Sequence, residues 1–275
     1  MLKRIYRNLA HRYFKSTTTL YKGWVLNKSK KLNITLLLNL SNYIDFLIYK
    51  NGLFEEHVIE NIRYFFTKQE ISLFVDIGSN IGQMSLFVAK NFPHVKVLSY
   101  EAVRSNYIQQ HASMLINNLN YDLNNLAISD NNKPLKIYMP KYMANVNLGK
   151  FNSGMASIVL DEFRDKDNVI EVPSVVLGPV LEKQILNLND KFVFFKIDVE
   201  GAELMVLNGL ISFLKIYGKV IIIIEFLFEK DLATYVAAKD LLLSLGFKMY
   251  DKDRNIVRTK ETWFGKNDDF IFIKD

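Results

Sequence analysis

Residues 73–89 constrain the fold of this chain more than any other stretch. An apolar run, 73–75, ends in Asp76, glycines follow at positions 78 and 82, and an amphipathic segment then begins. This order predicts a buried strand, a glycine turn and a helix. Because glycine has no Cβ, such a turn lets a ligand approach the backbone closely. Ligands of open α/β sheets bind outside the carboxyl ends of strands, so we expect a binding site at this turn.

The spacing of the turn, Asp76-x-Gly78-x-x-x-Gly82, does not fit two common nucleotide sites. A P-loop needs G-x-x-x-x-G-K-[ST], and a dinucleotide turn needs G-x-G-x-x-G. The carboxylate at the strand end suits a cationic or hydroxyl-bearing ligand better than a pyrophosphate. The pattern resembles the first motif of S-adenosylmethionine-dependent methyltransferases, whose glycine turn touches the methionine part of the cofactor. On this motif alone, the alternative is a plain strand-turn-helix with Ser or Asn as N-cap.

Strands alternate with helices along most of the chain. This alternation predicts a doubly wound α/β fold with a mostly parallel seven-stranded sheet and helices on both faces. No helix separates the last two predicted strands, so the last strand is expected to be antiparallel. The predicted strands are 73–76, 95–100, 122–129, 192–197, 220–224, 247–250 and 269–273.

An N-terminal arm, 1–52, is expected to be basic and largely helical, and one domain, 53–275, follows it. Residues 1–44 hold nine Lys and Arg and no Asp or Glu, whereas the rest of the chain holds 26 basic and 29 acidic residues. Residues 1–16 place apolar side chains at helical spacing opposite a basic face. Such a helix can pack on the body or on a second copy of the chain, lie on an anionic membrane or contact nucleic acid. Residues 32–50 are read as a short helix or a pair of strands.

The composition excludes some kinds of functional site and bears on the cellular location of the protein. Its 275 residues include no Cys, which excludes a disulfide, a thiolate metal site and a cysteine nucleophile. No apolar run reaches the ~18 residues of a membrane span. We therefore expect a cytoplasmic protein whose residues 1–31 can contact the inner face of the membrane. A homo-oligomer is left open.

Glu101 follows the second predicted strand, about 20 residues after the glycine turn. A carboxylate there can accept hydrogen bonds from both ribose hydroxyls, and a surface glutamate at a strand end is the alternative. Residues 134–178 then interrupt the alternation of strands and helices. Long irregular insertions are often functional lids, and we interpret this one either as a cover on the substrate side or as an antiparallel decoration.

Acidic side chains follow four of the predicted parallel strands, namely Asp76, Glu101, Asp198 with Glu200, and Glu225. Right-handed crossovers bring the carboxyl ends of these strands to one rim of the sheet. Unpaired carboxylates are costly in a buried cleft, so we expect them to bind hydroxyls, an ammonium group, Lys196 or a metal. No His stands at these strand ends, and no metal site is predicted.

Two motifs together give a narrower resemblance. The chain resembles the FkbM-type methyltransferases in Val-Asp-Ile-Gly-Ser-Asn-Ile-Gly (75–82) and in Lys-Ile-Asp-Val-Glu-Gly-Ala-Glu (196–203). Ile-Glu-Phe at 224–226 and Ala-Ile-Ser-Asp at 127–130 also fit the pattern, and the resemblance covers about 53–275. It departs after the second strand, where that family often has Glu-Pro and this chain has Glu-Ala. The resemblance implies a Rossmann-like enzyme that uses S-adenosyl-L-methionine and commonly O-methylates sugars or polyketides.

The resemblance also implies roles for the rim residues. Asp198 and Glu200 are predicted to be catalytic, as base or as contacts to the acceptor hydroxyl, with Lys196 beside them. Glu225 and Glu203 are predicted to bind the acceptor. For Glu200 and Glu203 the alternative is the charged first turn of a helix, where the macrodipole favours acids. The predicted cofactor contacts are Asp76, Gly78, Ser79, Asn80, Gly82, Glu101 and Ala127.

The predicted function is transfer of a methyl group to a hydroxyl of a small molecule or glycan, with a bacterial surface polysaccharide sugar as the first choice. The alternatives are a nucleic-acid methyltransferase that uses the basic arm, and a non-catalytic binding protein that retains the fold. Methyltransferases that act on the amino groups of nucleic-acid bases share an Asn/Asp-Pro-Pro-aromatic motif after the fourth strand. Asp-Val-Glu-Gly stands there in this chain, at 198–201, so nucleic acid is the less favoured partner.

Overall fold

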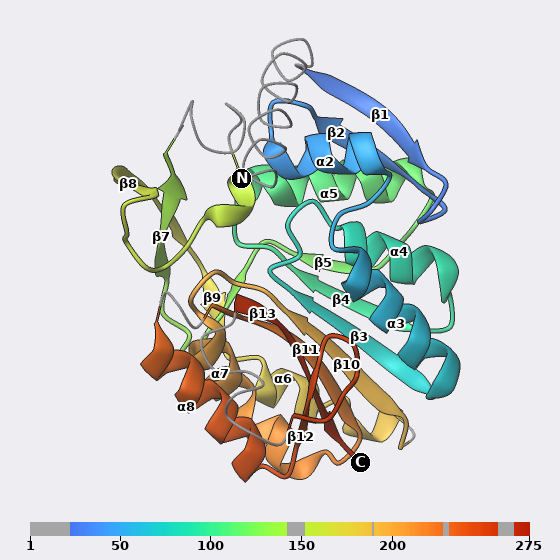
Figure 1. Cartoon of the computed structure of the whole chain (residues 1–275), viewed down its shortest axis with the longest axis vertical. Coiled ribbons are helices and arrows are strands. Elements are labelled where there is room, and N and C mark those ends of the chain that lie inside the picture. The colour runs from blue at the N-terminus through green and yellow to red at the C-terminus, as the bar shows by residue number, and fades with distance from the viewer. Residues whose placement is uncertain (1–22, 142–151, 189, 228–230, 258–266) are drawn as a thin grey trace, which may run out of the picture.

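The computed structural model describes residues 23–141, 152–188, 190–227, 231–257 and 267–275. A seven-stranded sheet in the order β12-β13-β11-β10-β3-β4-β5 lies between two layers of helices (Figure 1). Its strands are β3 (Ile71–Ile77), β4 (Lys96–Tyr100), β5 (Asp122–Asn124), β10 (Phe192–Ile197), β11 (Val220–Leu227), β12 (Lys248–Asp251) and β13 (Asn267–Lys274).

Neighbouring strands of this sheet are parallel except at β13, which pairs antiparallel with both β11 and β12. The prediction of a mostly parallel sheet with an antiparallel last strand is therefore confirmed. Between β3 and β10 the strand order changes direction, since the chain runs outward through β4 and β5 before it returns to β10. Such a switch point leaves a crevice at the carboxyl ends of the strands, which is where doubly wound folds bind ligands.

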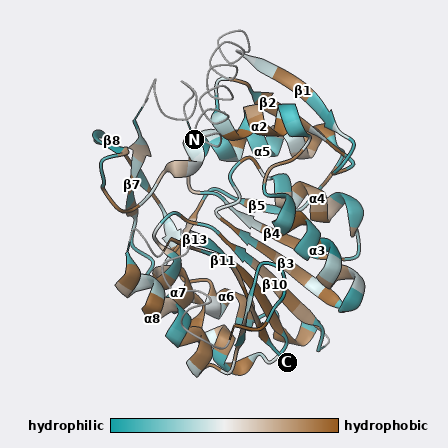
Figure 2. Ribbon diagram, viewed as in Figure 1, coloured by the Kyte–Doolittle hydropathy of each residue, from teal (hydrophilic) through white to brown (hydrophobic). Residues whose placement is uncertain are grey.

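Successive side chains of β3 pack into two cores on opposite faces of the sheet. Leu73, Val75 and Ile77 join the core formed with α6, α7 and α8, whereas Phe74 joins the core formed with α3 and α4. Burial on both faces explains the near-continuous apolar sequence of the central strands (Figure 2). The helices are α2 (Tyr43–Asn51), α3 (Glu56–Lys68), α4 (Gln83–Asn91), α5 (Arg104–Ile116), α6 (Gly178–Glu182), α7 (Glu203–Ile216) and α8 (Leu232–Ser244).

The described part of the N-terminal arm begins with a hairpin of β1 (Trp24–Ser29) and β2 (Ile34–Asn39), so the prediction of a largely helical arm is wrong over these residues. Buried and half-buried positions alternate along β2, with the period of two that marks a strand. Three consecutive leucines, 36–38, hide this period in the sequence. The predicted amphipathic helix 1–16 lies outside the described residues.

Side chains of α5 and its C-cap form hydrogen bonds with backbone groups at the outer edge of β2. The amides of Thr35 and Leu37 donate to Asn117 Oδ1 (2.8 Å) and Ser113 Oγ (3.0 Å), and Gln109 Nε2 donates to the carbonyl of Leu37 (2.8 Å). A strand edge exposes donors and acceptors that need partners, and these amide and hydroxyl groups take the place of a third strand. This contact accounts for Gln109 and Ser113 of α5 and for Asn117 at its C-cap.

The third predicted strand, 122–129, is in fact two strands, because β5 ends at Asn124 and β6 (Ala127–Ile128) pairs with β9 (Ser174–Val175) outside the main sheet. The insertion 134–178 contains the antiparallel pair β7 (Leu135–Pro140) and β8 (Arg164–Val172), together with a 3₁₀ turn, η2 (Ser153–Met155). A second short 3₁₀ turn, η3 (Ile185–Leu188), follows α6. The antiparallel interpretation of the insertion is thus confirmed for β7 and β8.

Candidate active site

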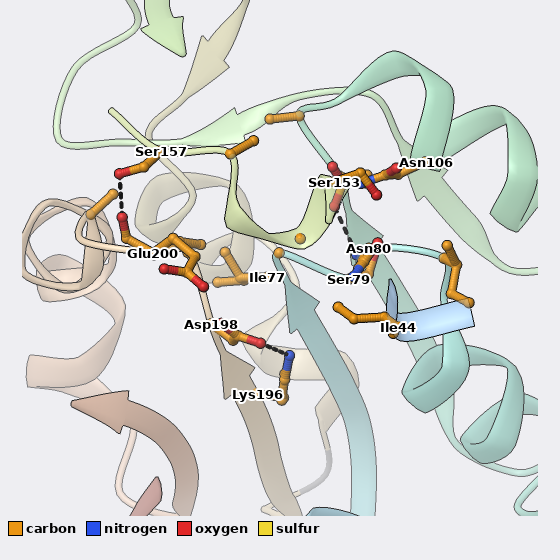
Figure 3. A pocket seen from close by; sticks show the side chains of 18 of the residues that line it. Ile44, Ile77, Ser79, Asn80, Asn106, Ser153, Ser157, Lys196, Asp198 and Glu200 are labelled. Carbon is orange, nitrogen blue, oxygen red and sulfur yellow. Dashed lines mark hydrogen bonds and ion pairs between the residues drawn. The ribbon is translucent and has the colours of Figure 1, made fainter. Parts of the chain in front are cut away.

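A cavity of about 220 Å³ lies at the carboxyl ends of β3, β4, β10 and β11. Residues 152–158 of the insertion and Ile44 of α2 complete its wall (Figure 3). The structure therefore brings part of the insertion to the cavity wall, and its role as a cover on the substrate side stays a prediction. Asp76, Gly82 and Glu203 are not among the lining residues. The predicted site residues that do line it are Gly78, Ser79, Asn80, Glu101, Ala127, Lys196, Asp198, Glu200 and Glu225.

The glycine turn presses against the end of β10. The amides of Gly78 and Ser79 both donate to the carbonyl of Tyr100 (3.0 and 3.1 Å), which fixes the turn to β4. A Cβ at Gly78, where φ is +77°, would lie 1.8 Å from the carbonyl oxygen of Asp198. The turn therefore needs glycine both for its left-handed backbone and for this close approach.

Asp76 is fully buried inside β3 and points at α4 rather than into the cavity. Its Oδ2 accepts from the amide (3.1 Å) and the hydroxyl (2.5 Å) of Ser85. Burial raises the pKa of Asp76, and the charge of Lys196, its register partner on β10, opposes that rise. Asp76 thus ties the helix to the strand that carries the turn, and any effect on a bound cofactor acts through the turn.

Gly82 also supports the turn without lining the cavity. It caps the N-terminus of α4 with φ at +81°, and an added Cβ would lie 2.3 Å from Cγ of Gln110. Gln110 is held by hydrogen bonds to the hydroxyls of Ser79 (2.7 Å) and Ser99 (2.7 Å). The second glycine therefore lets α5 approach the turn closely.

Glu101 lies at the end of β4, as predicted, and is hydrogen-bonded to the same turn. Its Oε2 accepts from the amide of Asn80 (2.7 Å) and its Oε1 accepts from the amide of Val103 (2.8 Å). Burial raises the pKa of Glu101 to about 7, against the effect of these hydrogen bonds. Asn80 has a left-handed backbone, φ +52°, and its buried Oδ1 has no hydrogen-bond partner among the described residues.

Lys196 and Asp198 form an ion pair at the end of β10, with Nζ 2.7 Å from Oδ2 (Figure 3). Burial alone would lower the pKa of Lys196, but the carboxylates of Asp198, Glu55 and Asp76 outweigh it and hold the pKa above its usual range. The cavity floor therefore carries a permanently charged ammonium group surrounded by carboxylates.

Glu200 is fixed by the insertion. Arg164, whose side chain is 2% exposed, lies 3.2 Å from Oε2 of Glu200, pairs with Asp161 and donates to the carbonyl of Met155 (3.0 Å). The hydroxyl of Ser157 donates to the carbonyl of Glu200. The backbone of Glu200 is left-handed, φ +53°. Such a conformation is unusual for a residue with a side chain, and here the insertion holds it in place.

The two residues predicted to bind the acceptor lie in different places. Glu203 is fully buried at the start of α7, where both carboxylate oxygens accept from the amide of Gly201 (3.1 Å). Glu203 therefore stabilises the helix start, which agrees with the first-turn alternative. Glu225 lies within β11 and lines the cavity opposite Asp269 of β13 in register. Burial, followed by the nearby Asp198, raises the pKa of Glu225 to about 10.

Several lining residues were not predicted from the sequence. Glu55, at the N-cap of α3, contributes a carboxyl group, and Ile44 and Ile48 of α2 contribute apolar surface. An acidic residue at a helix start is ordinary, so the sequence alone gives no signal that Glu55 faces the cavity. Asn106 of α5 and Ser153 of η2 are further polar lining residues of this kind.

One group of side chains with metal-binding chemistry lies beside the cavity in the described residues. Ligand atoms of His57, Asp268 and Asp269 lie within 4.8 Å of one another. Asp269 is already paired with His57, and Asp268 is paired with Lys252 (2.8 Å). Side chains of the protein thus already bind both carboxylates, and we assign no metal ligands here.

A family model described as the methyltransferase FkbM domain matches residues 76–249, which is more than half of the chain. The chain belongs to this family. The match contains the glycine turn, Glu101, the rim of β10 and Glu225, and it excludes the N-terminal arm and α3. No curated protein matches the chain.

Three solved methyltransferase-fold structures show how remote the similar chains are. TYW2 of M. jannaschii, in complex with AdoMet, has 11% identity and a TM-score of 0.44 over 93% of this chain and 88% of its own. The Pyrococcus abyssi tRNA (uracil-54, C5)-methyltransferase, in complex with S-adenosyl-L-homocysteine, has 11% identity and a TM-score of 0.43. That match covers 92% of this chain but 44% of the other chain. Aeropyrum pernix fibrillarin has 10% identity and a TM-score of 0.35, over 74% and 67%. We draw nothing about the acceptor from these values.

As an FkbM methyltransferase, the chain uses S-adenosyl-L-methionine, and the cavity lining fits this molecule. Glu101 would receive the ribose hydroxyls, and Leu126 and Ile128 offer apolar surface for the adenine ring. The unpartnered Oδ1 of Asn80 would accept a hydrogen bond from the ammonium group of the methionine part. When bound, S-adenosyl-L-methionine supplies an electrophilic methyl group. The chain's own contribution is to hold an acceptor atom in line with that group, which can lower a barrier by roughly 7–11 kcal/mol.

Proposed function

We propose that this methyltransferase O-methylates a hydroxyl of a small molecule or glycan, and that a bacterial surface polysaccharide sugar is the preferred acceptor. The observation that carries this proposal is the set of carboxyl groups, Glu55, Asp198 and Glu225, on the β10 and β11 side of the cavity. Carboxyl oxygens accept hydrogen bonds from sugar hydroxyls. The apolar Ile44 and Ile158 offer surface for the face of a sugar ring.

A nucleic-acid acceptor suits this cavity less well. Lys196 is the only Lys or Arg among the described residues that line the cavity, and it is paired with Asp198, so the lining offers a phosphate group no unpaired cation. The basic residues that would attract a phosphate backbone stand in the arm, before Asp45. A non-catalytic binding protein is the remaining alternative, and a transfer assay separates it from the enzyme.

The test combines cofactor binding with a search for the acceptor. S-adenosyl-L-homocysteine at 100 times its Kd should stabilise the fold by about 2.7 kcal/mol, seen as a higher Tm. Methyl transfer is then measured on nucleotide sugars, glycan fragments and a tRNA mixture. Transfer to a sugar hydroxyl supports the proposal, and transfer to tRNA alone contradicts it. Binding of S-adenosyl-L-homocysteine without transfer to any sugar also counts against it.

We further propose that the enzyme works in the cytoplasm and that residues 1–31 bring it to the inner face of the membrane. The arm holds nine basic and no acidic residues up to residue 44, which suits anionic lipid headgroups. On β1, the side chains of Trp24 and Leu26 are 58% and 63% exposed. Within the described residues, no helix has the length and apolar character needed to cross a membrane.

A further inference from the structure

The two carboxylates predicted to act as the base are already engaged. Asp198 forms its ion pair with Lys196 at 2.7 Å, and Glu200 forms one with the buried Arg164 at 3.2 Å. A proton placed on either carboxylate would weaken an ion pair with a buried cation, Lys196 or Arg164. Breaking a buried ion pair is unfavourable. Proton transfer to Asp198 or Glu200 would therefore work against the packing of the site.

Glu55 has the opposite surroundings. It lines the cavity from the start of α3, and its side chain makes no capping hydrogen bond to that helix. No hydrogen bond or ion pair of its carboxyl group is found within the described residues. Its backbone is left-handed, φ +51°. A residue with a Cβ adopts this conformation at a free-energy cost, and such strain is concentrated at functional sites.

We propose that Glu55 is the general base that accepts the proton of the acceptor hydroxyl, an inference that rests on the proposed O-methyl transfer. The acceptor oxygen forms a C–O bond to the transferred methyl carbon, while the C–S bond breaks and leaves its electron pair on sulfur. The hydroxyl proton passes to the carboxylate of Glu55. The products are the methyl ether, neutral S-adenosyl-L-homocysteine and protonated Glu55, so atoms and charge balance.

The charges around Glu55 agree with this role. Burial raises the pKa of Glu55 to about 8, and Asp198 of β10 and Asp269 of β13 add to the rise. Lys196 of β10 and His57 of α3 oppose it. A base is most effective when its pKa lies near the working pH.

Glu225 of β11 faces the same group of charges, and burial together with the nearby Asp198 raises its pKa. In its protonated form Glu225 is suited to donate a hydrogen bond to the acceptor. Glu55 lines the cavity and makes no capping hydrogen bond, so we assign the uptake of the proton to Glu55 rather than to Glu225.

The test compares the wild type with Glu55→Gln and with Glu56→Gln as the matched control. Glu56 is the next residue on α3, and its side chain is 59% exposed and paired with Lys31. Glu55→Gln should keep the thermal shift given by S-adenosyl-L-homocysteine and lower kcat by about 10²- to 10⁴-fold. In the wild type, kcat/KM should rise with pH, reach half of its maximum near pH 8 and level off above it, and this rise should be absent in Glu55→Gln. Glu56→Gln should match the wild type.

A readout without an acceptor completes the test. Infrared difference spectra of the protein saturated with S-adenosyl-L-homocysteine should show carbonyl bands of protonated carboxyl groups fading as pH rises through the neutral range, because burial raises the pKa values of Glu101 and Glu203 as well as that of Glu55. Glu55→Gln should reduce this change by the contribution of one carboxyl group, and Glu56→Gln should leave it as in the wild type. If the wild type transfers methyl groups and Glu55→Gln keeps its kcat and the rise of kcat/KM with pH, the inference is overturned while the proposed function stands. If the wild type binds S-adenosyl-L-homocysteine but methylates no hydroxyl, the proposed function fails. If the infrared change with pH is the same in the wild type and in Glu55→Gln, the assignment of Glu55 as the base fails, whatever the outcome for the proposed function.

Discussion

Replacing Gly78 with alanine tests how closely the glycine turn is pressed against β10. The added Cβ would lie 1.8 Å from the carbonyl oxygen of Asp198, whereas real Cβ atoms keep at least 3.0 Å from such neighbours. The turn and the end of β10 must therefore separate by at least 1.2 Å. Because the obstacle is backbone, no change of rotamer can relieve it.

The expected loss of stability has two parts. A left-handed backbone costs an alanine about 1–2 kcal/mol, and overpacking adds about 1–3 kcal/mol. We expect Gly78→Ala to lower the free energy of unfolding by about 2–5 kcal/mol, measured by urea denaturation. Separation of the turn also moves the amide of Asn80 away from Glu101. The Tm increase caused by S-adenosyl-L-homocysteine should therefore disappear.

Gly246→Ala is the matched control. Gly246 also has a left-handed backbone, φ +89°, but an added Cβ there would meet no atom within 4 Å. Only the conformational part remains, about 1–2 kcal/mol, and the response to S-adenosyl-L-homocysteine should be unchanged. Equal losses in the two variants would refute the close approach of Gly78 to β10.

Three further outcomes are expected. Arg164→Met should lower the free energy of unfolding by about 3 kcal/mol, because it removes the buried guanidinium group that pairs with both Asp161 and Glu200; a loss below about 1 kcal/mol in urea denaturation would contradict this. The pKa of Glu101 is raised from 4.5 to about 7, so its ionisation weakens the fold as pH rises through that window. The free energy of unfolding of Glu101→Gln should therefore rise relative to that of the wild type between pH 5 and pH 8, by at most about 3 kcal/mol. If urea denaturation shows the same difference between the two proteins at both pH values, this effect of burial is contradicted. The full chain should sediment with phosphatidylglycerol vesicles at low salt and dissociate as salt rises; equal binding by a variant lacking 1–22, which keeps β1, would exclude that segment as the contact.

Periodicity and strand-end chemistry were enough to predict the main sheet. The apolar runs of β10 and β11 and the missing helix before β13 determine its parallel core and its antiparallel strand. A short helix or a pair of strands was predicted for residues 32–50, which hold β2 and α2, but the pairing of β2 with β1 was not predicted because the stability of this hairpin comes from a distant segment. Backbone amides at the edge of β2 donate hydrogen bonds to Ser113 and Asn117, about 80 residues further along the chain. The sequence around β2 does not indicate such a distant partner.

The sequence predicted those site residues that directly follow a parallel strand. Glu101 and Asp198 lie in the cavity because the strand geometry alone brings them there. Asp76 and Glu203 were predicted as ligand contacts, yet local hydrogen bonds to Ser85 and Gly201 hold them outside the lining. Glu55 could not be predicted, because its place depends on how α3 packs against β10 and β13.

The cavity wall is divided between two parts of the chain, one inside the match to the family model and one before it. The cofactor side, with Gly78 and Glu101, lies inside the part that matches the family model, 76–249. Ile44, Phe54 and Glu55 also line the cavity but precede that part. Under the proposed function, exchange of the segment before residue 76 should change the acceptor that is methylated while Gly78 and Glu101 stay in place.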